Sequence, residues 1–253
     1  MATFHHTFLL PLLLVTLAAG GTAAVKFHVT TTTPAIRSTF NRRIGIRYAT
    51  QTMTTASSFL FKTFRQRDVA DRKPLRNVTV LIDSSADHGL VNRNGTAETN
   101  EFRIGINCFS NVSSSTAADR RREFSGLVYH YMTHVWGWNG RGGAPAGLIS
   151  GRAEYVRWKA GFGMLRVKAA SGGSGGERWD QGYYLTAKFL DYCDGLRAAV
   201  NGTTPPFIPG MNMLMKDGYS DGYFKQLLGK SVGELWREYK STVGKGPFLP
   251  ILH

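Results

Sequence analysis

The stretch LVYHYMTHVWGWNGRGGAPAGLISGRAEYVRWKAG, residues 127–161, decides the fold. Apolar residues recur at helical spacing on both sides of a Gly-rich segment, which predicts helices near 119–137 and 145–160. Residues four apart lie on the same face of a helix. His130 and His134 can therefore present two imidazole rings to one metal ion.

The residue that follows His130 does not fit the motif of a zinc hydrolase. Such a motif reads H-E-x-x-H: the Glu acts on a metal-bound water, and a later residue supplies the third protein ligand. Tyr131 occupies the Glu position here. A phenol with an ordinary pKa of about 10 keeps its proton at neutral pH, so Tyr131 does not replace the general base. It also continues an apolar stripe with Leu127, Val128 and Val135, which is typical of core packing.

The sequence on either side of this stretch predicts an α+β fold with its strands in the first half. Strands are expected over three apolar runs, the last as an edge or hairpin strand: 25–31, 78–82 and 102–106. The Thr-rich run with Pro34 predicts a loop, as does the Gly/Ser run 171–176. Helices are expected over four further segments: 44–64, 181–199, 221–228 and 231–242.

Residues 1–24 have the features of a secretory signal peptide. They contain no Lys, Arg, Asp or Glu, and the apolar stretch from Phe8 to Ala19 precedes a Thr22-x-Ala24 cleavage pattern. A transmembrane anchor needs about 20 apolar residues, which no segment supplies. The sequence therefore predicts an extracellular protein without a transmembrane segment, whose mature chain begins near Val25.

Two features agree with secretion but leave alternatives open. The cysteines, Cys108 and Cys193, form either one disulfide or two free thiols, because their spacing cannot establish proximity. Each Asn-x-Ser/Thr sequon is either a glycan site on an exposed turn or a chance tripeptide; they begin at Asn77, Asn94, Asn111 and Asn201.

The chain is strongly basic. Its 253 residues include 31 Lys+Arg against 17 Asp+Glu, a formal net charge of +14, and its 42% hydrophobic residues can bury a core. A field of this sign attracts polyanions, which for a secreted protein are acidic wall polysaccharides, anionic membrane surfaces or released nucleic acid. Since no nucleic-acid motif is present, specific nucleic-acid binding is not expected. Each basic cluster is most simply a solvated face: 42–43, 65–67, 72–76 and 120–122.

The stretch at 127–161 resembles the plant basic secretory protein family. The segments ERWDQGYYLTAKFLDYC (177–193) and GYSDGYFKQLLGKSVGELWREYK (218–240) resemble it as well, as do ADRK (70–73) and the strand at 78–82. The resemblance implies one zincin-like domain over 25–243 with a tail at 244–253. It also implies metallopeptidase-like chemistry, a place in the plant apoplast or cell wall, and a role in defence or stress.

Several positions depart from the pattern that the resemblance implies. Family members carry H-E-M-T-H and then L-I-E-G-I-A-D-Y, where the Glu is the third metal ligand and the Asp supports the site. Here Ser150 occupies the third-ligand position, Glu154 retains the supporting carboxylate, and Tyr184 replaces a further family Asp. Two imidazoles without a third anionic ligand make a weak zinc site. Glu154 would have to reach back about 6 Å along the helix to become that ligand.

These departures favour a catalytically impaired member of the family: a secreted, monomeric protein that binds a peptide or protein ligand and has a vestigial metal site. The strand at 102–106 would border its groove. Five aromatic residues either line that groove or pack in the core: Trp136, Trp138, Tyr155, Trp158 and Trp179. Two alternatives stay open. One is an active zinc-dependent endopeptidase with an unconventional site, and the other is a defence protein that binds acidic cell-wall polysaccharide through charge.

Overall fold

The computed structural model describes residues 24–90, 100–109, 116–163, 177–198 and 206–243. The expected features that fall elsewhere lie outside these described residues: nearly all of the signal peptide, the sequons at Asn94, Asn111 and Asn201, the loop at 171–176 and the tail at 244–253.

A mixed four-stranded sheet forms the first half of the fold. The strands are β1 (Lys26–Thr31), β2 (Asn77–Asp83), β3 (His88–Leu90) and β4 (Glu101–Gly105), in the spatial order β1-β2-β4-β3. The first three strands in this order are parallel, while β3 runs antiparallel to β4 with His88 opposite Ile104. Strand β3 is therefore an edge of the described sheet.

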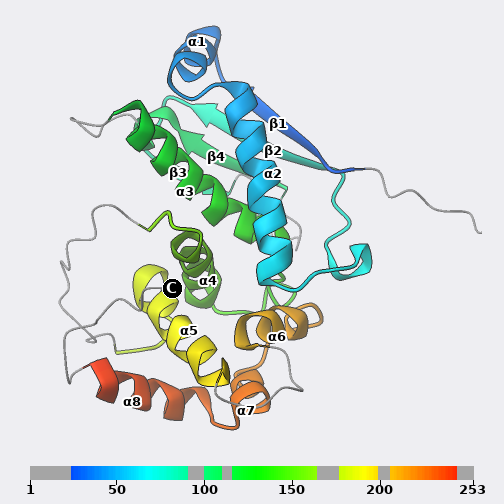
Figure 1. The fold of residues 1–253 in the computed structure, drawn as a ribbon, viewed down its shortest axis with the longest axis vertical. Coiled ribbons are helices and arrows are strands. Elements are labelled where there is room, and N and C mark those ends of the chain that lie inside the picture. The colour runs from blue at the N-terminus through cyan, green and yellow to red at the C-terminus, as the bar shows by residue number, and fades with distance from the viewer. Residues whose placement is uncertain (1–23, 91–99, 110–115, 164–176, 199–205, 244–253) are drawn as a thin grey trace, which may run out of the picture.

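Three helices cover the sheet. Helices α1 (Pro34–Arg43) and α2 (Ile46–Thr63) make the crossover between β1 and β2, and α2 lies beside α3 (Ala117–Trp136) across one face (Figure 1). Alternate residues of β2 are fully buried beneath these helices. Successive side chains of a strand point to opposite faces of the sheet. The alternating burial in β2 therefore shows that one face of the sheet packs against the helices.

Five helices build the second half: α4 (Ala146–Lys159), α5 (Tyr183–Ala198), α6 (Phe207–Leu214), α7 (Gly222–Leu228) and α8 (Val232–Val243). Figure 1 shows them gathered at the end of the molecule away from the sheet. Short 3₁₀ turns lie at η1 (Val69–Asp71) and η2 (Ile106–Cys108).

Helix α3 joins the two halves. It begins with a capping box in which Thr116 and Asp119 satisfy each other's backbone N–H groups, and most of its last three turns are buried. The Arg157 guanidinium of α4 holds both carboxylate oxygens of Glu123 of α3 at 2.9 Å. Arg157 is 3% exposed, so this ion pair fixes α4 against α3 and with it the relative placement of residues on the two helices.

The expected α+β fold is confirmed, with a mixed sheet first and a helical half after it. Three local features differ from the expectations or add to them. The strand expected at 102–106 is β4, an internal strand that pairs with both β2 and β3, so it is a hairpin strand but not an edge. A helix begins at Pro34 where a loop was expected, because Thr33 caps it and proline suits the first helical position. Helix α6 was not expected. None of the helices in the described ranges is long and apolar enough to cross a membrane.

The two cysteines are unpaired in the structure. Cys108 lies at η2 and is half-buried, and Cys193 is fully buried in α5, where burial raises the pKa of its thiol. The structure therefore has the two free thiols and not the disulfide.

The basic clusters are not all solvated. Lys73 is 4% exposed, and its Nζ donates to the carbonyl oxygen of His134 at 3.4 Å. The Arg72 guanidinium lies 4.0 Å from the centre of the Phe61 ring. The cluster at 72–76 is thus partly a packing element, whereas Arg65 and Arg67 are exposed.

Candidate functional site

The two histidines converge on one point. His130 and His134 lie one turn apart on α3, and their Nε2 atoms are 3.2 Å apart. Two nitrogen ligands of a tetrahedral zinc ion, each about 2.0–2.1 Å from it, are themselves about 3.3 Å apart. The α3 backbone therefore places both imidazoles as the sequence predicts.

A carboxylate from α4 orients the first imidazole. Glu154 Oε1 accepts a hydrogen bond from His130 Nδ1 at 2.8 Å, and both residues are buried. Burial alone would raise the pKa of Glu154, but the hydrogen bond and charge of His130, together with nearby Arg157, outweigh burial and hold that pKa below its ordinary value. Nδ1 is the ring nitrogen that does not face His134. Glu154 therefore lies in the supporting position, behind the ring, and not in a ligand position.

This hydrogen bond also bears on the contact between the two rings. In the tautomer that donates from Nδ1 to Glu154, His130 has only a lone pair at Nε2. His134 then donates its Nε2 proton to that lone pair. The facing nitrogens of the two histidines are thus paired with each other, while Glu154 holds the other nitrogen of His130.

Tyr131 occupies the general-base position as a packed and tethered residue. Its ring is 5% exposed and stacks on Phe102 of β4, with centroids 5.4 Å apart and planes at 13°. Its hydroxyl is hydrogen-bonded to Nδ1 of His88 on β3. Burial lowers the pKa of His88, and the charge of His130 lowers it further. The core packing expected for Tyr131 is present, and the hydroxyl is committed to a neutral imidazole.

The third-ligand position has no anionic group. Ser150 on α4 is half-buried, and its Oγ donates to the carbonyl oxygen of Gly147 at 3.3 Å. The nearest loop contributes Asp180, but both of its oxygens are bound by Arg178 at 2.9 and 2.6 Å. In the described ranges, no three His, Cys, Asp or Glu residues are grouped to hold a metal ion. The residues present fit two nitrogen ligands and not the three-ligand set of a catalytic zinc.

These residues line one hollow, which we call the histidine pocket. Its volume is about 580 Å³, and its walls come from β3, α3, the start of α4 and the segment before α5. The residues that define it around the histidines are Asp87, His88, Leu90, His130, Tyr131, His134, Ser150, Asp180 and Tyr183. Edge strand β3 therefore forms one rim, in the place expected for the strand at 102–106.

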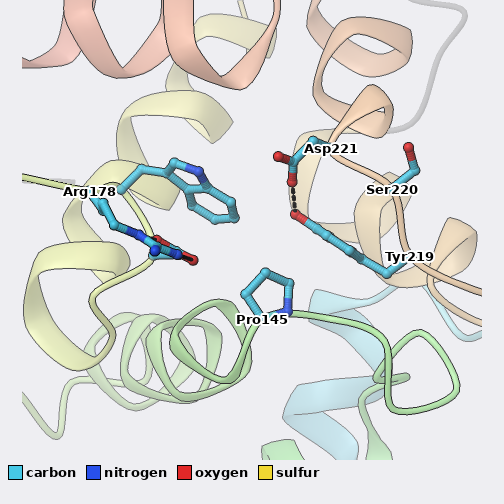
Figure 2. A pocket seen from close by; sticks show the side chains of 7 residues that line it. Pro145, Arg178, Tyr219, Ser220 and Asp221 are labelled. Carbon is cyan, nitrogen blue, oxygen red and sulfur yellow. Dashed lines mark hydrogen bonds and ion pairs between the residues drawn. The ribbon is translucent and has the colours of Figure 1, made fainter.

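A second hollow adjoins the histidine pocket at Asp180. It measures about 650 Å³ and is lined by Pro145, Arg178, Trp179, Asp180, Tyr219, Ser220 and Asp221. Figure 2 shows Arg178 on one side and Tyr219 and Asp221 on the other, with Pro145 between them. The Tyr219 hydroxyl donates to Asp221 Oδ1 at 2.6 Å. This hollow thus presents two carboxylates and one guanidinium.

Other expected site residues lie away from the histidine pocket. Tyr184 points outward on α5 with 54% of its surface exposed and is not among the residues that line the pocket. Asn77 is exposed, but it is the first residue of β2 and not part of a turn, and its Oδ1 lies 3.1 Å from His28 Nε2. None of the five aromatic residues expected near the groove lines this pocket; Trp136 and Tyr155 are core residues.

Sequence reasoning missed His88. The residue lies in a strand of three residues, which is too short to show an alternating pattern, and long-range pairing with β4 alone brings it to Tyr131. A histidine that faces the base position from another element was not detectable in the sequence alone.

Comparisons with known proteins identify the family of the chain. The sequence profile of the BSP family, described as a peptidase of plants and bacteria, matches residues 22–239. A basic secretory protease of Boswellia serrata is 33% identical over 66 residues, which are 26% of this chain and 67% of that relative. No solved structure matches the chain. Because the profile spans well over half of the sequence, the chain belongs to the BSP family of plant and bacterial peptidases.

Proposed function

We propose that this protein is a secreted, zincin-like member of the BSP family that binds extended peptides in the histidine pocket and is impaired as a peptidase. The observation that carries the proposal is the hydrogen bond between the Tyr131 hydroxyl and His88 Nδ1. It places a phenol, tethered and stacked, at the position where a peptidase of this pattern needs a carboxylate base. Loss of a positioned general base costs about 10²–10⁴ in rate.

The polar groups around the pocket support the same proposal. Ser150 offers only a weakly binding hydroxyl, Asp180 is neutralised by Arg178, and Glu154 is committed to His130. Zinc held by two neutral imidazoles would bind weakly, because the anionic ligand that completes such sites is missing. If bound, zinc would rest on Nε2 of His130 and His134, and we assign it no catalytic step.

Peptide binding is supported by the edge strand. An extended segment can pair with the outer side of β3, and alternate side chains would then point into hollows beside it. The histidine pocket, which β3 borders, accepts one such side chain, and the adjoining hollow in Figure 2, which β3 does not line, accepts one from further along the peptide. The carboxylates of Asp180 and Asp221 facing Arg178 favour a polar or basic side chain there over an acidic one.

Elemental analysis of zinc tests the impaired site. The protein is purified from a eukaryotic secretion host without chelators or metal columns, and we expect well under one zinc per chain. His28→Ala serves as a matched control, since His28 lies on β1 and is not among the residues that line the pocket. Near-stoichiometric zinc that His130→Ala removes and His28→Ala retains would overturn the proposal. Saturable, salt-resistant peptide binding without turnover would support it.

One observation favours a second function, an active peptidase with an unconventional site. His88 lines the pocket and its Nδ1 is hydrogen-bonded to the Tyr131 hydroxyl, so an imidazole lies one hydrogen bond away from the position of the missing carboxylate. This function requires peptide hydrolysis that EDTA abolishes and that His88→Gln reduces by about 10² or more.

The proposal of a secreted protein also includes the signal peptide and glycosylation at the sequons. Secretion from a eukaryotic host tests the first, and a glycosidase-induced mass shift tests the second.

A further inference from the structure

A separate, strongly cationic hollow lies at the C-terminal end of α2, and we call it the basic pocket. It measures about 480 Å³ and is lined by Ser58, Phe61, Lys62, Arg65, Gln66, Arg67 and Arg72. Four of these residues carry a positive charge and none carries a negative one. Like charges gathered around a hollow repel one another, so their arrangement favours an anionic occupant.

Three of the four cations have no partner in the part of the chain that the structure describes. Arg72 is held in place, since it packs on Phe61 and donates to the carbonyl oxygens of Gln66 and Arg67 at 3.1 and 3.0 Å. Lys62, Arg65 and Arg67 are exposed, and within the described residues none of their side chains makes a hydrogen bond or an ion pair. The pocket thus has one fixed and three uncommitted cations.

The backbone at Arg65 is held in a conformation that glycine adopts more easily. Gln66 N–H donates to the carbonyl of Phe61 and Arg65 N–H to that of Lys62, which is the Schellman pattern that ends a helix. Arg65 occupies its left-handed position, with φ of 52°. A side chain there is disfavoured relative to glycine. The presence of arginine therefore points to a use for its guanidinium.

A smaller hollow continues the basic pocket. It measures about 240 Å³, shares Arg65 and Gln66 with the basic pocket, and adds Trp138, Asn212 and Lys216 among its lining residues. Its other lining residues include Asp71. The Trp138 ring beside the Asp71 carboxylate suits a sugar, whose apolar face packs on the ring and whose hydroxyls donate to the carboxylate. Asn212 is buried, and its Oδ1 already accepts from the Trp138 backbone N–H and from Arg152.

Gln66 adds an acceptor between the two hollows. Its Nε2 donates to the carbonyl oxygen of Asp71 at 3.1 Å, which fixes the orientation of the amide. Its Oε1 then has no hydrogen-bond partner among the described residues, although Gln66 is 3% exposed. A buried acceptor normally has a donor, and a ligand hydroxyl would supply one after a small side-chain shift.

We propose that the two hollows together bind an acidic polysaccharide: Lys62, Arg65 and Arg67 bind uronate carboxylates, and the hollow beside Trp138 binds a neighbouring sugar ring. Concave hollows suit separate anionic sugar units better than the flat surface of a membrane. Asp71 accepts sugar hydroxyls in the hollow beside Trp138, and the sequence has no nucleic-acid-binding motif. This site is distinct from the histidine pocket, and the proposal stands or fails independently of peptide binding.

Titration calorimetry with de-esterified oligogalacturonate tests the site on the full mature chain. We expect the triple variant Lys62→Ala, Arg65→Ala, Arg67→Ala to bind about tenfold or more weakly, because each exposed charge pair contributes modestly and the three add. The matched control removes the same charge from exposed residues near the other end of α2: Arg37→Ala, Arg42→Ala, Arg47→Ala. It should weaken binding less than threefold.

Each outcome decides the proposal. Equal weakening by both triple variants would mean a diffuse effect of net charge and would overturn the site. Equal affinity for fully methyl-esterified oligogalacturonate would overturn the role of the carboxylates. Tighter binding of single-stranded DNA or phosphatidylserine vesicles than of oligogalacturonate would overturn the choice of ligand. Should the triple variant misfold by circular dichroism, Lys62→Ala and Lys216→Ala separately should still each weaken binding about twofold or more.

Discussion

The histidine pocket and the basic pocket differ in how their polar groups are paired. In the histidine pocket, His130 bonds to Glu154 and His134, and Tyr131 bonds to His88. Asp180 is bound there by Arg178. In the basic pocket, three exposed cations have no partner among the described residues.

Burial accounts for this difference. A buried polar group without a partner costs about 1–3 kcal/mol, so the interior around His130 must satisfy itself when no ligand is bound. An exposed cation keeps its water and pays no such cost, so it can remain unpaired until an anion arrives. The polar groups of the histidine pocket are therefore paired without a ligand. The cations of the basic pocket repel one another until an anion binds.

The largest expected effect comes from breaking the pairing in the histidine pocket. Tyr131→Glu combined with Ser150→Glu supplies the two carboxylates that H-E-x-x-H chemistry needs and removes the bond to His88. We expect near-stoichiometric zinc and peptide hydrolysis about 10² or more above the unmodified protein. Elemental analysis and a quenched fluorescent peptide measure the two.

The single variants separate the two contributions. Ser150→Glu alone should raise zinc content with little hydrolysis, and Tyr131→Glu alone should raise neither to the level of the double variant. A folded double variant without zinc would show that the imidazoles do not converge in solution as the 3.2 Å separation implies.

The sequence predicts the fold well because periodicity is a local property. Helix α3 and strand β2 have clear periods of 3.6 and two, and both lie within a few residues of the expected ranges. Strand order is not local. Nothing in the residues 102–106 distinguishes an internal strand from an edge, and the three residues of β3 have no detectable pattern.

In the candidate site, too, the sequence predicts local relations but not contacts between separate elements. His130 and His134 share a helix, so their convergence follows from spacing alone. The bond of Glu154 to His130 matches the supporting role that the family resemblance implies, although helix packing places it. The link from Tyr131 to His88 and the cationic hollow at Arg65 depend on contacts between separate elements, which no sequence pattern contains.

A smaller effect should sharpen the description of the basic pocket. Arg65→Gly relieves the left-handed backbone at φ of 52° and should stabilise the protein by about 1 kcal/mol. The same change removes one uncommitted cation and should weaken oligogalacturonate binding about two- to fivefold. Urea denaturation and titration calorimetry measure the two. Arg67→Gly is the control, since Arg67 has no positive φ and its loss should weaken binding without stabilising the fold.

The opposite result for Arg65 would be informative. If Arg65→Gly destabilised the protein, the arginine would contribute to the fold itself, and its unfavourable backbone would no longer indicate a ligand.

The smallest expected effect is a difference in acid sensitivity between the pockets. The hydrogen bonds from Arg178 hold the pKa of Asp180 below its ordinary value of 3.8. A carboxyl whose folded pKa is depressed contributes stability that is complete above the unfolded pKa and is lost as pH falls through the folded pKa. The stability difference between the unmodified protein and Asp180→Asn should therefore shrink as pH falls below about 4, with a slope of less than one proton because a single group titrates.

Urea denaturation between about pH 3 and 6 measures that slope. Lys62→Met is the matched variant in the basic pocket, where no lining residue is a carboxylate, and its stability difference should stay constant over the same range. A constant difference for Asp180→Asn as well would mean that Arg178 does not hold the carboxylate in solution. Asp180 would then be an uncommitted anion in the wall of the histidine pocket, and the contrast between a pocket with paired polar groups and one with unpaired cations would fail.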